Sequence, residues 1–580
     1  MRVSGWPGAP PRVILWAMLR AVLPVLLLSL ASCAPDLEAI IQEIQDAPLL
    51  STGSSSGPDT AAPTTAATED TVGSASDGDD ETHAAGSSEN GAGDTGETGA
   101  ASSTGDDDEV LLPEVVAIDL PKQVSALGPV PIAVQTKNTS AVRVRQDGVN
   151  VGELAGAGEG MFVGELAVKG ADDNGTHHVE VIATLGEHED SDEATYEVQV
   201  PESGTPAWAM PGPLGSRTNR VVLTPEGDAI EAGLLVGAGV PRPSLRKRSG
   251  LNGSELWPEK TIVLSELEGH VADIAVAPDG GLWVAMNVKE ASQKWRPHIL
   301  LLTPDGGSAD VDYPGELGYT VRAVAADDEG GCFAVGYAAA EGGDLDVARW
   351  RINAMQQSTI ADTWDYRPMG SLPHSFLDAG LDVVIAGDIA WVAGLSSGQH
   401  DDKDVYTRGM LVPMNIHTGE VGSVIIVPAS GSWKHSVLYG LALDLEGDPG
   451  VIVTGSGCQG FCGGGTQRIE TSRYTFAGVR TWHQLEMPAE GAYGSDVVVD
   501  SQGRAVVVGA SKQGGVLRGW AFAHMIGAAE LEPLWELWFP VSKEDSEGLG
   551  AARDKYDRIF VGGYMTAGGA PQARLVQVGQ

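Results

Sequence analysis

The sequence predicts an all-β protein, and the stretch 495–509 shows why. It reads SDVVVDSQGRAVVVG, in which two runs of valine flank a polar turn from Asp500 to Gly503. Valine favours the pleated, buried surface of a sheet, and Asp and Gly are common in turns, so the stretch predicts a β-hairpin. The frequent glycines, 77 among 580 residues, and the scarce aromatic residues, 6%, agree with many short strands joined by turns.

Hairpins of this pattern recur along the last two-thirds of the chain. Between them lies a second unit, an alternating strand followed by a glycine turn and often a tryptophan, as in TSRYTFAGVRTW at 471–482. Two strands from each unit give four strands per repeat, which is typical of a β-propeller blade. The copies predict a propeller of about seven blades over residues 216–580, with six or eight as alternatives. The hairpins close, 48 to 61 residues apart, at positions 237, 285, 336, 394, 455, 509 and 562.

The end of the chain is expected to close this ring. The C-terminal segment ARLVQVG alternates like a strand, and we expect it to pair with NRVVLT at 219–224, which would leave no open sheet edge. Over residues 213–580 the repeats resemble the β-propeller repeat proteins found among secreted bacterial lipoproteins. This resemblance implies the fold and leaves the activity open, because propellers carry many unrelated functions.

A smaller β domain is predicted over residues 110–201. Short alternating runs separated by Asp, Asn and Gly turn residues are typical of an antiparallel β-sandwich. The phrases VPIAVQTKNTSAVRVRQDG and NGTHHVEVIATLGE resemble bacterial immunoglobulin-like modules of cell-envelope proteins, which implies that architecture. The Pro- and Gly-rich residues 202–215 are predicted to be a linker. The runs lie at 130–134, 142–145, 162–168, 179–183 and 196–200.

The N-terminus has the pattern of an export signal. Three arginines precede the apolar run AVLPVLLLSL at 21–30, which is too short to span a bilayer and is typical of a signal-peptide core. The run ends in Leu-Ala-Ser-Cys, which resembles the lipobox of bacterial lipoproteins. The resemblance implies that residues 1–32 are removed and that Cys33 carries a lipid anchor in the membrane. Ala34 then implies sorting to the outer membrane, where the protein would face the periplasm or the cell surface. The alternative to a lipobox is an ordinary secretory signal in which Cys33 occurs by chance.

The segment after Cys33 is predicted to be a spacer. Residues 33–50 carry a short apolar pattern of helical period near the anchor. Residues 51–109 consist largely of Ser, Thr, Gly, Ala, Asp and Glu, which cannot bury enough apolar surface to order, so a disordered acidic tether is expected. The whole chain holds 36 Lys and Arg against 79 Asp and Glu, a net charge of −43. Phosphate backbones repel such a polyanion, which argues against nucleic-acid partners.

The four cysteines are too few for a disulfide scaffold. Cys458 and Cys462 lie in one glycine-rich loop, and a local disulfide is the favoured interpretation, since a zinc site would need two further ligands. Cys332 lies in an apolar strand and is expected to be a buried thiol.

Propellers bind ligands through loops around the central channel, so polar loop residues are the candidate pocket residues. The run HDDKD at 400–404 could hold a cation, and His435 could act as an acid or base, although each alone is more often a solvated loop residue. No catalytic residue, metal site or cofactor is predicted, and a structural cation such as calcium is left open. The candidates are His374, His400, Asp401, Asp402, Asp404, Trp433 and His435.

Two functions fit these features. The first is a cell-envelope lipoprotein that displays the propeller as a binding or scaffolding platform for a protein or polysaccharide of the envelope. The second is an extracytoplasmic hydrolase or lyase with its active site at the central channel. The sequence favours the binding protein, because no motif orders a catalytic set of residues.

Overall fold

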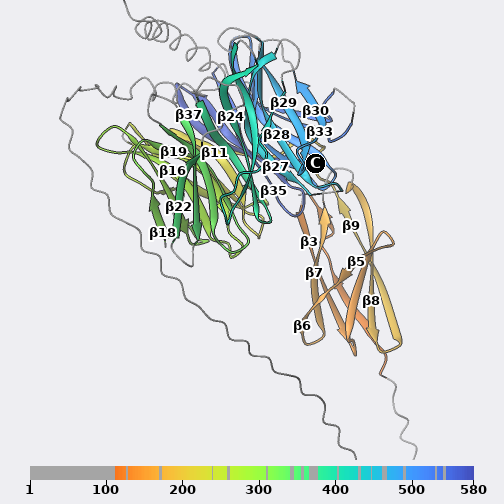
Figure 1. Cartoon of the computed structure of the whole chain (residues 1–580). Helices are drawn as coiled ribbons and strands as arrows, with labels where there is room; N and C mark the ends of the chain where they lie inside the picture. The colour runs from red at the N-terminus through yellow and green to blue at the C-terminus, as the bar shows by residue number, and fades with distance from the viewer. Residues whose placement is uncertain are drawn as a thin grey trace, which may run out of the picture. The chain divides into compact units, whose positions relative to one another are not determined.

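The computed structural model describes residues 111–579, apart from short gaps, and every element within them is a β-strand (Figure 1). No helix in these ranges is long and apolar enough to cross a membrane. The predicted signal peptide, the anchor-proximal segment and the tether lie outside the described residues. The gaps are 126–127, 169–172, 238, 258–260, 308–310, 340–344, 354–357, 365–376, 402–403, 429–432, 446, 460–466, 487–490, 529–531 and 540–543.

The first two sheets form a β-sandwich. One sheet has the strand order β1-β3-β7-β6 and the other β2-β9-β8-β4-β5. The alternation of β3 turns Val130, Ile132 and Val134 into a shared core, where they meet Val179 and Val181 of β8. The strands are β1 (Glu114–Asp119), β2 (Gln123–Val124), β3 (Gly128–Lys137), β4 (Ala141–Gln146), β5 (Val149–Glu153), β6 (Ala155–Gly158), β7 (Met161–Val168), β8 (Gly175–Leu185) and β9 (His188–Val198).

The remaining strands form seven four-stranded antiparallel sheets among the described residues. Sheet 1 holds β11 (Ser216–Leu223), β12 (Ala229–Gly237), β13 (Val240–Arg248) and β14 (Ile262–Val263). Sheet 2 holds β15 (Gly269–Val276), β16 (Leu282–Lys289), β17 (Trp295–Leu302) and β18 (Val311–Pro314). Sheet 3 holds β19 (Tyr319–Ala326), β20 (Cys332–Ala339), β21 (Leu345–Asn353) and β22 (Ser358–Trp364).

Sheets 4 to 7 repeat the same order. Sheet 4 holds β23 (Leu377–Ala386), β24 (Ile389–Asp401), β25 (Asp404–Asn415) and β26 (Ile425–Ile426). Sheet 5 holds β27 (Trp433–Asp444), β28 (Gly450–Gln459), β29 (Gln467–Thr475) and β30 (Arg480–Glu486). Sheet 6 holds β31 (Ala492–Val499), β32 (Arg504–Gln513), β33 (Val516–Met525) and β34 (Trp535–Trp538). Sheet 7 holds β35 (Ser546–Arg553), β36 (Ile559–Ala567), β37 (Ala570–Val578) and, from upstream, β10 (Pro206–Leu214).

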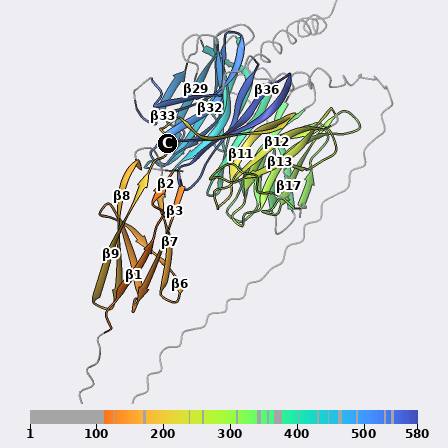
Figure 2. The same cartoon turned by 180° about the vertical axis from the view of Figure 1, so that it is seen from behind.

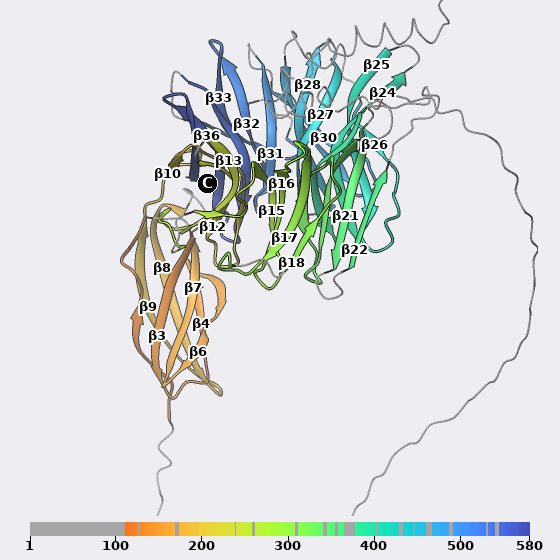
Figure 3. The same ribbon diagram turned by 90° about the vertical axis from the view of Figure 1, so that its left-hand side faces the viewer.

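The seven sheets make a closed ring, which confirms the predicted propeller fold. The first strands of successive sheets contact one another, and β11 of sheet 1 contacts β35 of sheet 7. Figure 2 shows β11, β12 and β13 of sheet 1 side by side, and Figure 3 shows β21 beside β22 in sheet 3. Apolar residues fill the space between neighbours: Phe333 and Val335 of sheet 3, for example, pack with Val383 and Val392 of sheet 4.

The ring closes differently from the prediction. The C-terminal strand β37 pairs with β10, not with residues 219–224, so most of the predicted linker is the outermost strand of sheet 7. Residues 219–224 fall instead mainly in β11, the first strand of sheet 1. Arg248 Nη2 donates to the Pro211 carbonyl (3.1 Å), and Gln572 Nε2 donates to that of Gly212 (2.9 Å). These contacts hold β10 in place. Its prolines and glycine are unusual in a strand, which is why the sequence did not predict one there.

Each first strand carries a β-bulge at the same place. One residue of the strand has no partner in the register with the second strand, which bends the strand and turns an extra side chain out of the alternation. The bulge explains the glycines at four predicted closing positions, 336, 394, 455 and 509, while the equivalent glycines of sheets 1 and 7 lie at 233 and 563. A Cβ at Gly394 would lie 1.9 Å from the Ala379 carbonyl oxygen, and one at Gly455 would lie 1.9 Å from that of Val437. The bulged residues are Asn219, Ala272, Arg322, Leu381, Tyr439, Ser495 and Leu549.

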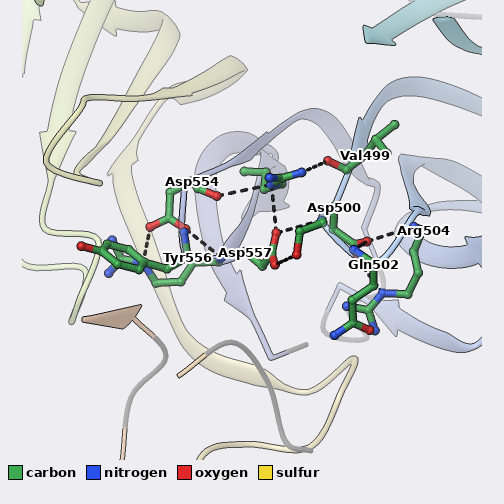
Figure 4. A network of polar contacts seen from close by, with 10 residues as sticks. Val499, Asp500, Gln502, Arg504, Asp554, Tyr556 and Asp557 are labelled. Atoms are coloured by element: carbon green, nitrogen blue, oxygen red, sulfur yellow. Dashed lines mark hydrogen bonds and ion pairs between the residues drawn. The ribbon is translucent and has the colours of Figure 1, made fainter. Parts of the chain in front are cut away.

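The turns between first and second strands in sheets 6 and 7 share one arrangement of hydrogen bonds despite their different sequences. Asp500 Oδ1 accepts from the Gln502 and Arg504 amides (both 2.9 Å), and its Oδ2 accepts from Arg504 Nε (2.5 Å). Asp554 holds Arg558 in the same way in sheet 7. Figure 4 shows the two turns joined through Asp557, which accepts from the Ser501 amide (3.0 Å). In these two turns the aspartate at the start therefore has the same role while the next residues differ.

Candidate functional site: the central cavity of the propeller

A cavity of about 90 Å³ lies at the centre of the ring. All seven bulged residues line it, one from each sheet. A bulge re-aims a side chain, and here seven bulges at one level aim seven side chains at a common axis. The site is therefore a product of the repeat itself, although the side chains differ from sheet to sheet.

Below the bulges lies a buried ion cluster, the floor cluster, formed by Arg220, Asp273, Asp382 and Asp496. The guanidinium of Arg220 meets one carboxylate from each of sheets 2, 4 and 6: Asp273 at 3.4 Å, Asp382 at 3.5 Å and Asp496 at 3.2 Å. The four side chains are only 9–13% exposed. One cation thus compensates part of the charge of three carboxylates in a region that excludes most water.

Each aspartate also holds the next sheet in the ring. Asp273 Oδ2 accepts from the Val324 amide of sheet 3 (2.8 Å). Asp382 Oδ2 accepts from Leu441 of sheet 5 (2.7 Å), and Asp496 Oδ2 from Ala551 of sheet 7 (2.8 Å). With Arg220 in sheet 1, the floor cluster therefore touches all seven sheets.

The residue after the bulge alternates between acidic and small around the ring. Sheets 2, 4 and 6 place aspartate there, and sheets 3, 5 and 7 place Ala323, Gly440 and Gly550. A Cβ at Gly440 would lie 2.5 Å from Asp496 Cα, and one at Gly550 would lie 2.8 Å from Arg220 Cα. The small residues therefore allow the first strands of neighbouring sheets to lie close together.

Burial governs the protonation of the floor cluster. Desolvation raises the pKa of Asp273 to about 6, against the opposing effect of Arg220. Burial likewise raises the pKa of Asp382 well above its ordinary value and raises the pKa of Asp496. The cluster therefore holds less negative charge near neutral pH than three exposed aspartates would.

Above the bulges lies a second set of polar residues, two positions earlier on the first strands: Arg217, His270, Tyr493 and Glu547. Glu547 is almost fully buried, accepts from the Tyr564 hydroxyl (2.8 Å) and lies 3.9 Å from Arg217 Nη2. Arg217 also lies over the Tyr564 ring, at 5.0 Å from its centroid. Burial beside Glu547 raises the pKa of Tyr564, so its hydroxyl stays protonated as the donor.

The cavity has two chemically different walls. Sheets 1 to 3 contribute Arg217, His270 and Arg322, which we call the cationic wall. Sheets 5 and 6 contribute Tyr439 and Tyr493, whose rings meet edge-on with centroids 6.4 Å apart. The Oγ of Ser495, beside them, is buried and has no hydrogen-bond partner among the described residues.

The structure places the residues predicted from the sequence elsewhere. His435 is buried and does not appear among the described lining residues; its Nδ1 accepts from the Thr407 amide (3.2 Å), which joins sheet 5 to sheet 4. Ser436 accepts from the Gly409 amide in the same way (2.9 Å). This contact makes His435 an inter-sheet link. His400, Asp401, Asp404 and Trp433 lie in strands, but their side chains are outside the description, and His374 and Asp402 fall in the gaps.

The structure describes two of the four cysteines, Cys332 and Cys458. Cys332 is buried and free, as expected, and burial raises the pKa of its thiol well above the ordinary value. Cys458 is buried in β28 and disulfide-bonded. Cys462 and Cys33 lie outside the described residues, so the predicted pairing and lipidation stay predictions. No group of three or more His, Cys, Asp or Glu side chains suited to a metal ion occurs in the described part of the chain.

Sequence reasoning missed the floor cluster and both walls. A signal for the floor cluster was present, because three hairpins begin with aspartate, as DIAV at 273, DVVI at 382 and DVVV at 496. These are every second repeat, which is unexpected for a solvated residue. The lining residues gave no such signal. A bulge breaks the strand alternation from which one infers the side of the sheet to which each side chain points.

No family model matches the chain, and no curated protein matches it either. Among solved structures it is similar to a protein of unknown function from Dyadobacter fermentans (9% identity, TM-score 0.36), covering 64% of this chain and 99% of that one. It is also similar to the β-propeller domain of the Trilobed protease from Pyrococcus furiosus (10% identity, TM-score 0.34), covering 62% of this chain and 97% of that one. A third similar structure is that of a quinoprotein alcohol dehydrogenase-like protein from Bacteroides thetaiotaomicron (10% identity, TM-score 0.32), covering 80% of this chain and 96% of that one. At these low values the assignment of a propeller depends on the seven sheets themselves.

Proposed function

We propose that the chain is a lipoprotein of the bacterial cell envelope that displays its propeller as a binding platform. The cavity at the propeller axis holds the part of the partner that is recognised. One observation carries the proposal: seven bulges direct seven different side chains into one cavity above a buried ion cluster that supports it. A concave site with a few converging polar groups is the usual form of a ligand site.

The proposed localisation is based on the lipobox-like residues that end at Cys33. Two or three acyl chains bury many methylene groups at about 0.8 kcal/mol each, so the anchor holds the protein at the membrane. The acidic residues 51–109 then act as a spacer between the anchor and the folded domains. Palmitate labelling tests the anchor: wild type incorporates label and Cys33→Ala does not, whereas equal labelling refutes the anchor.

Capture of envelope protein and polysaccharide fractions by the full chain tests the platform. Ala272→Trp fills the cavity from sheet 2, and we expect it to abolish capture while the unfolding temperature stays close to that of wild type. Val151→Trp, on an exposed strand of the sandwich, is the matched control and should capture normally. Equal capture by wild type and Ala272→Trp rejects the cavity as the binding site.

An enzyme is the second candidate, because the cavity also contains residue types used in acid–base catalysis: His270, Tyr439, Tyr493 and Glu547. A hydrolase or lyase acting there would release new chain ends from an envelope polysaccharide. Release by wild type and none by Ala272→Trp would favour the enzyme, whereas binding without release favours the platform.

A further inference from the structure

A second hollow lies at the other end of the first strands, beside the turns that lead into the second strands. It has a volume of about 380 Å³ and is open to solvent. The floor cluster separates it from the central cavity, because on sheet 6 Asp496 comes between Ser495 of the cavity and Val498 of the hollow. We call it the turn-side hollow. Its described lining residues are Ala442, Val498, Val499, Arg553, Asp554 and Lys555.

One part of the turn-side hollow is apolar. Ala442 of sheet 5 and Val498 and Val499 of sheet 6 lie near the ends of their first strands and are half-buried, and we call them the aliphatic wall. The charged floor cluster begins only two residues before Val498, about 7 Å along the strand. A long acyl chain would therefore reach buried charges, whereas a short aliphatic side chain fits against the wall.

Sheet 7 contributes charges to the hollow that mostly satisfy one another. Arg553 Nε lies 3.0 Å from Asp557 Oδ1, and Arg553 Nη1 donates to the Val499 carbonyl (2.6 Å) (Figure 4). Asp554 Oδ2 accepts from Nε of the buried Arg558 (2.6 Å). The two arginines are thus matched by two aspartates, and neither guanidinium is needed for a ligand.

Lys555 is the cation that remains. Its side chain is exposed, with Nζ 4.8 Å from the centroid of the Tyr556 ring, and it forms no ion pair within the described part of the chain. A hydrogen bond to Tyr556 uses one of its three N–H groups. Glu165, an acid near it, accepts from the Tyr556 hydroxyl. The ammonium can therefore bind a ligand carboxylate at the edge of the apolar surface.

The equivalent turns of the other sheets carry the opposite charge. These six turns contain no Lys or Arg, and those of sheets 1 to 5 expose acidic side chains. Such a rim repels a purely anionic molecule and attracts a cationic segment. A peptide with basic residues before an aliphatic C-terminal residue matches the rim, the aliphatic wall and Lys555 together. The exposed acids are Glu226, Asp279, Asp328, Glu329, Asp388 and Asp448.

We propose that the turn-side hollow binds the basic C-terminal segment of a partner protein. Its last side chain, an aliphatic one, lies on the aliphatic wall, and its terminal carboxylate lies at Lys555. The inference goes beyond the proposed function, because this hollow is separate from the central cavity and neither site requires the other.

Calorimetric titration of the full chain with the peptide acetyl-Lys-Gly-Lys-Gly-Val tests the proposal. We expect the peptide to bind at least about tenfold more tightly than its C-terminal amide, which lacks the carboxylate. The same peptide ending in glycine should also bind more weakly, because it lacks the aliphatic side chain. Octanoate carries a carboxylate on a lipid-like chain without basic residues, and it should bind more weakly than the peptide.

Substitution of the exposed lysine locates the site. Lys555→Gln should lower the affinity for the peptide by about tenfold or more. Lys512→Gln makes the same change at the other end of sheet 6 and should leave the affinity unchanged. Val499→Thr keeps the volume of the side chain but makes the aliphatic wall more polar, and it should weaken the peptide severalfold.

Four results would overturn the inference. Equal affinity for the peptide and its amide refutes carboxylate recognition, as does a Lys555→Gln variant that binds the peptide normally. Tighter binding of octanoate than of the peptide refutes a protein C-terminus as the occupant. No measurable binding of the peptide refutes the site as a whole and leaves the proposed platform at the central cavity unaffected.

Discussion

The floor cluster and the cationic wall lie within a few residues of each other on the first strands of sheets 1 and 2, yet their surroundings differ. Arg220 is nearly buried and shared among three carboxylates, whereas the Arg217 side chain is 19% exposed and Arg322 is part-buried at the cavity surface. The three carboxylates in turn bind backbone amides of the next sheets. These contacts indicate that the floor cluster maintains the ring, whereas the cationic wall lines the cavity.

Removal of the shared cation should have the largest effect. Arg220→Met leaves three carboxyl groups buried without their counter-ion, and breaking a buried ion pair in this way costs about 3–5 kcal/mol. Urea unfolding of the full chain should show this loss in the propeller transition. Replacing Arg143 on the sandwich surface is the control and should change the free energy of unfolding little. A change below about 1 kcal/mol for Arg220→Met would show that the floor cluster does not stabilise the ring.

The pH dependence of stability is the next largest effect. The pKa of Asp273 is raised from 3.8 to about 6, so the folded state keeps a proton that the unfolded chain releases earlier. The free energy of unfolding should therefore fall as the pH rises from about 4 through 6, by on the order of 3 kcal/mol for this group.

Urea unfolding at pH 4.5 and 7.5 measures this slope. Burial also raises the pKa of Asp382 and of Asp496, which contribute in the same direction. Asp273→Asn is therefore the necessary comparison, and it should flatten the slope. An unchanged slope in Asp273→Asn would assign the pH dependence to other groups.

The glycines opposite the bulges offer a smaller test of the backbone geometry. Gly455→Ala places a Cβ 1.9 Å from the Val437 carbonyl oxygen, so the first strand of sheet 5 must shift. We expect a loss of about 1–3 kcal/mol, the usual cost of overpacking a core. Gly156→Ala in the sandwich is the control, because its Cβ would have its nearest neighbour at 4.0 Å. Equal unfolding temperatures for the two variants would contradict the close approach.

The sandwich should show the smallest effect. His177 Nδ1 lies 2.6 Å from Asp147 Oδ2 and its Nε2 lies 2.6 Å from the Asp173 carbonyl oxygen. Burial lowers the pKa of His177, but these two acceptors outweigh it and raise the pKa above 6.5. The pair therefore stabilises the fold at acidic to neutral pH, and this contribution is lost as the pH rises through the raised pKa.

An NMR titration of the His177 ring protons measures this pKa directly. Asp147→Asn should lower it and should cost only a few tenths of a kcal/mol, because the pair is partly exposed. A His177 pKa that is the same in the variant would rule out the ion pair.

The sequence allowed the architecture to be predicted because valine runs and turn residues act locally. The hairpin at 495–509 is the pair β31–β32, and the second repeat unit supplied the outer strands. Ring closure was assigned to the wrong strand, since the pairing of β37 with β10 joins segments more than 350 residues apart and β10 carries breaking residues. Long-range pairing of this kind leaves no local pattern.

The candidate site was less accessible to sequence reasoning. Polar loop residues such as His435 were chosen because loops are usually exposed, and the structure instead buries His435 between two sheets. The residues that do line the cavity, such as Arg322 and Tyr439, lie within valine- and alanine-rich strands and look like ordinary strand positions. Only the bulge, which depends on pairing, turns them toward the axis.

Thermal unfolding of the full chain, together with capture of envelope fractions, tests the central claim most directly, because the two measurements separate stabilisation by the floor cluster from recognition by the cavity. Arg220→Met should unfold at a clearly lower temperature than wild type, and Ala272→Trp should not. Wild type should capture envelope material, and Ala272→Trp should capture none. The claim is contradicted if Ala272→Trp destabilises the protein as much as Arg220→Met does, or if it captures as much material as wild type.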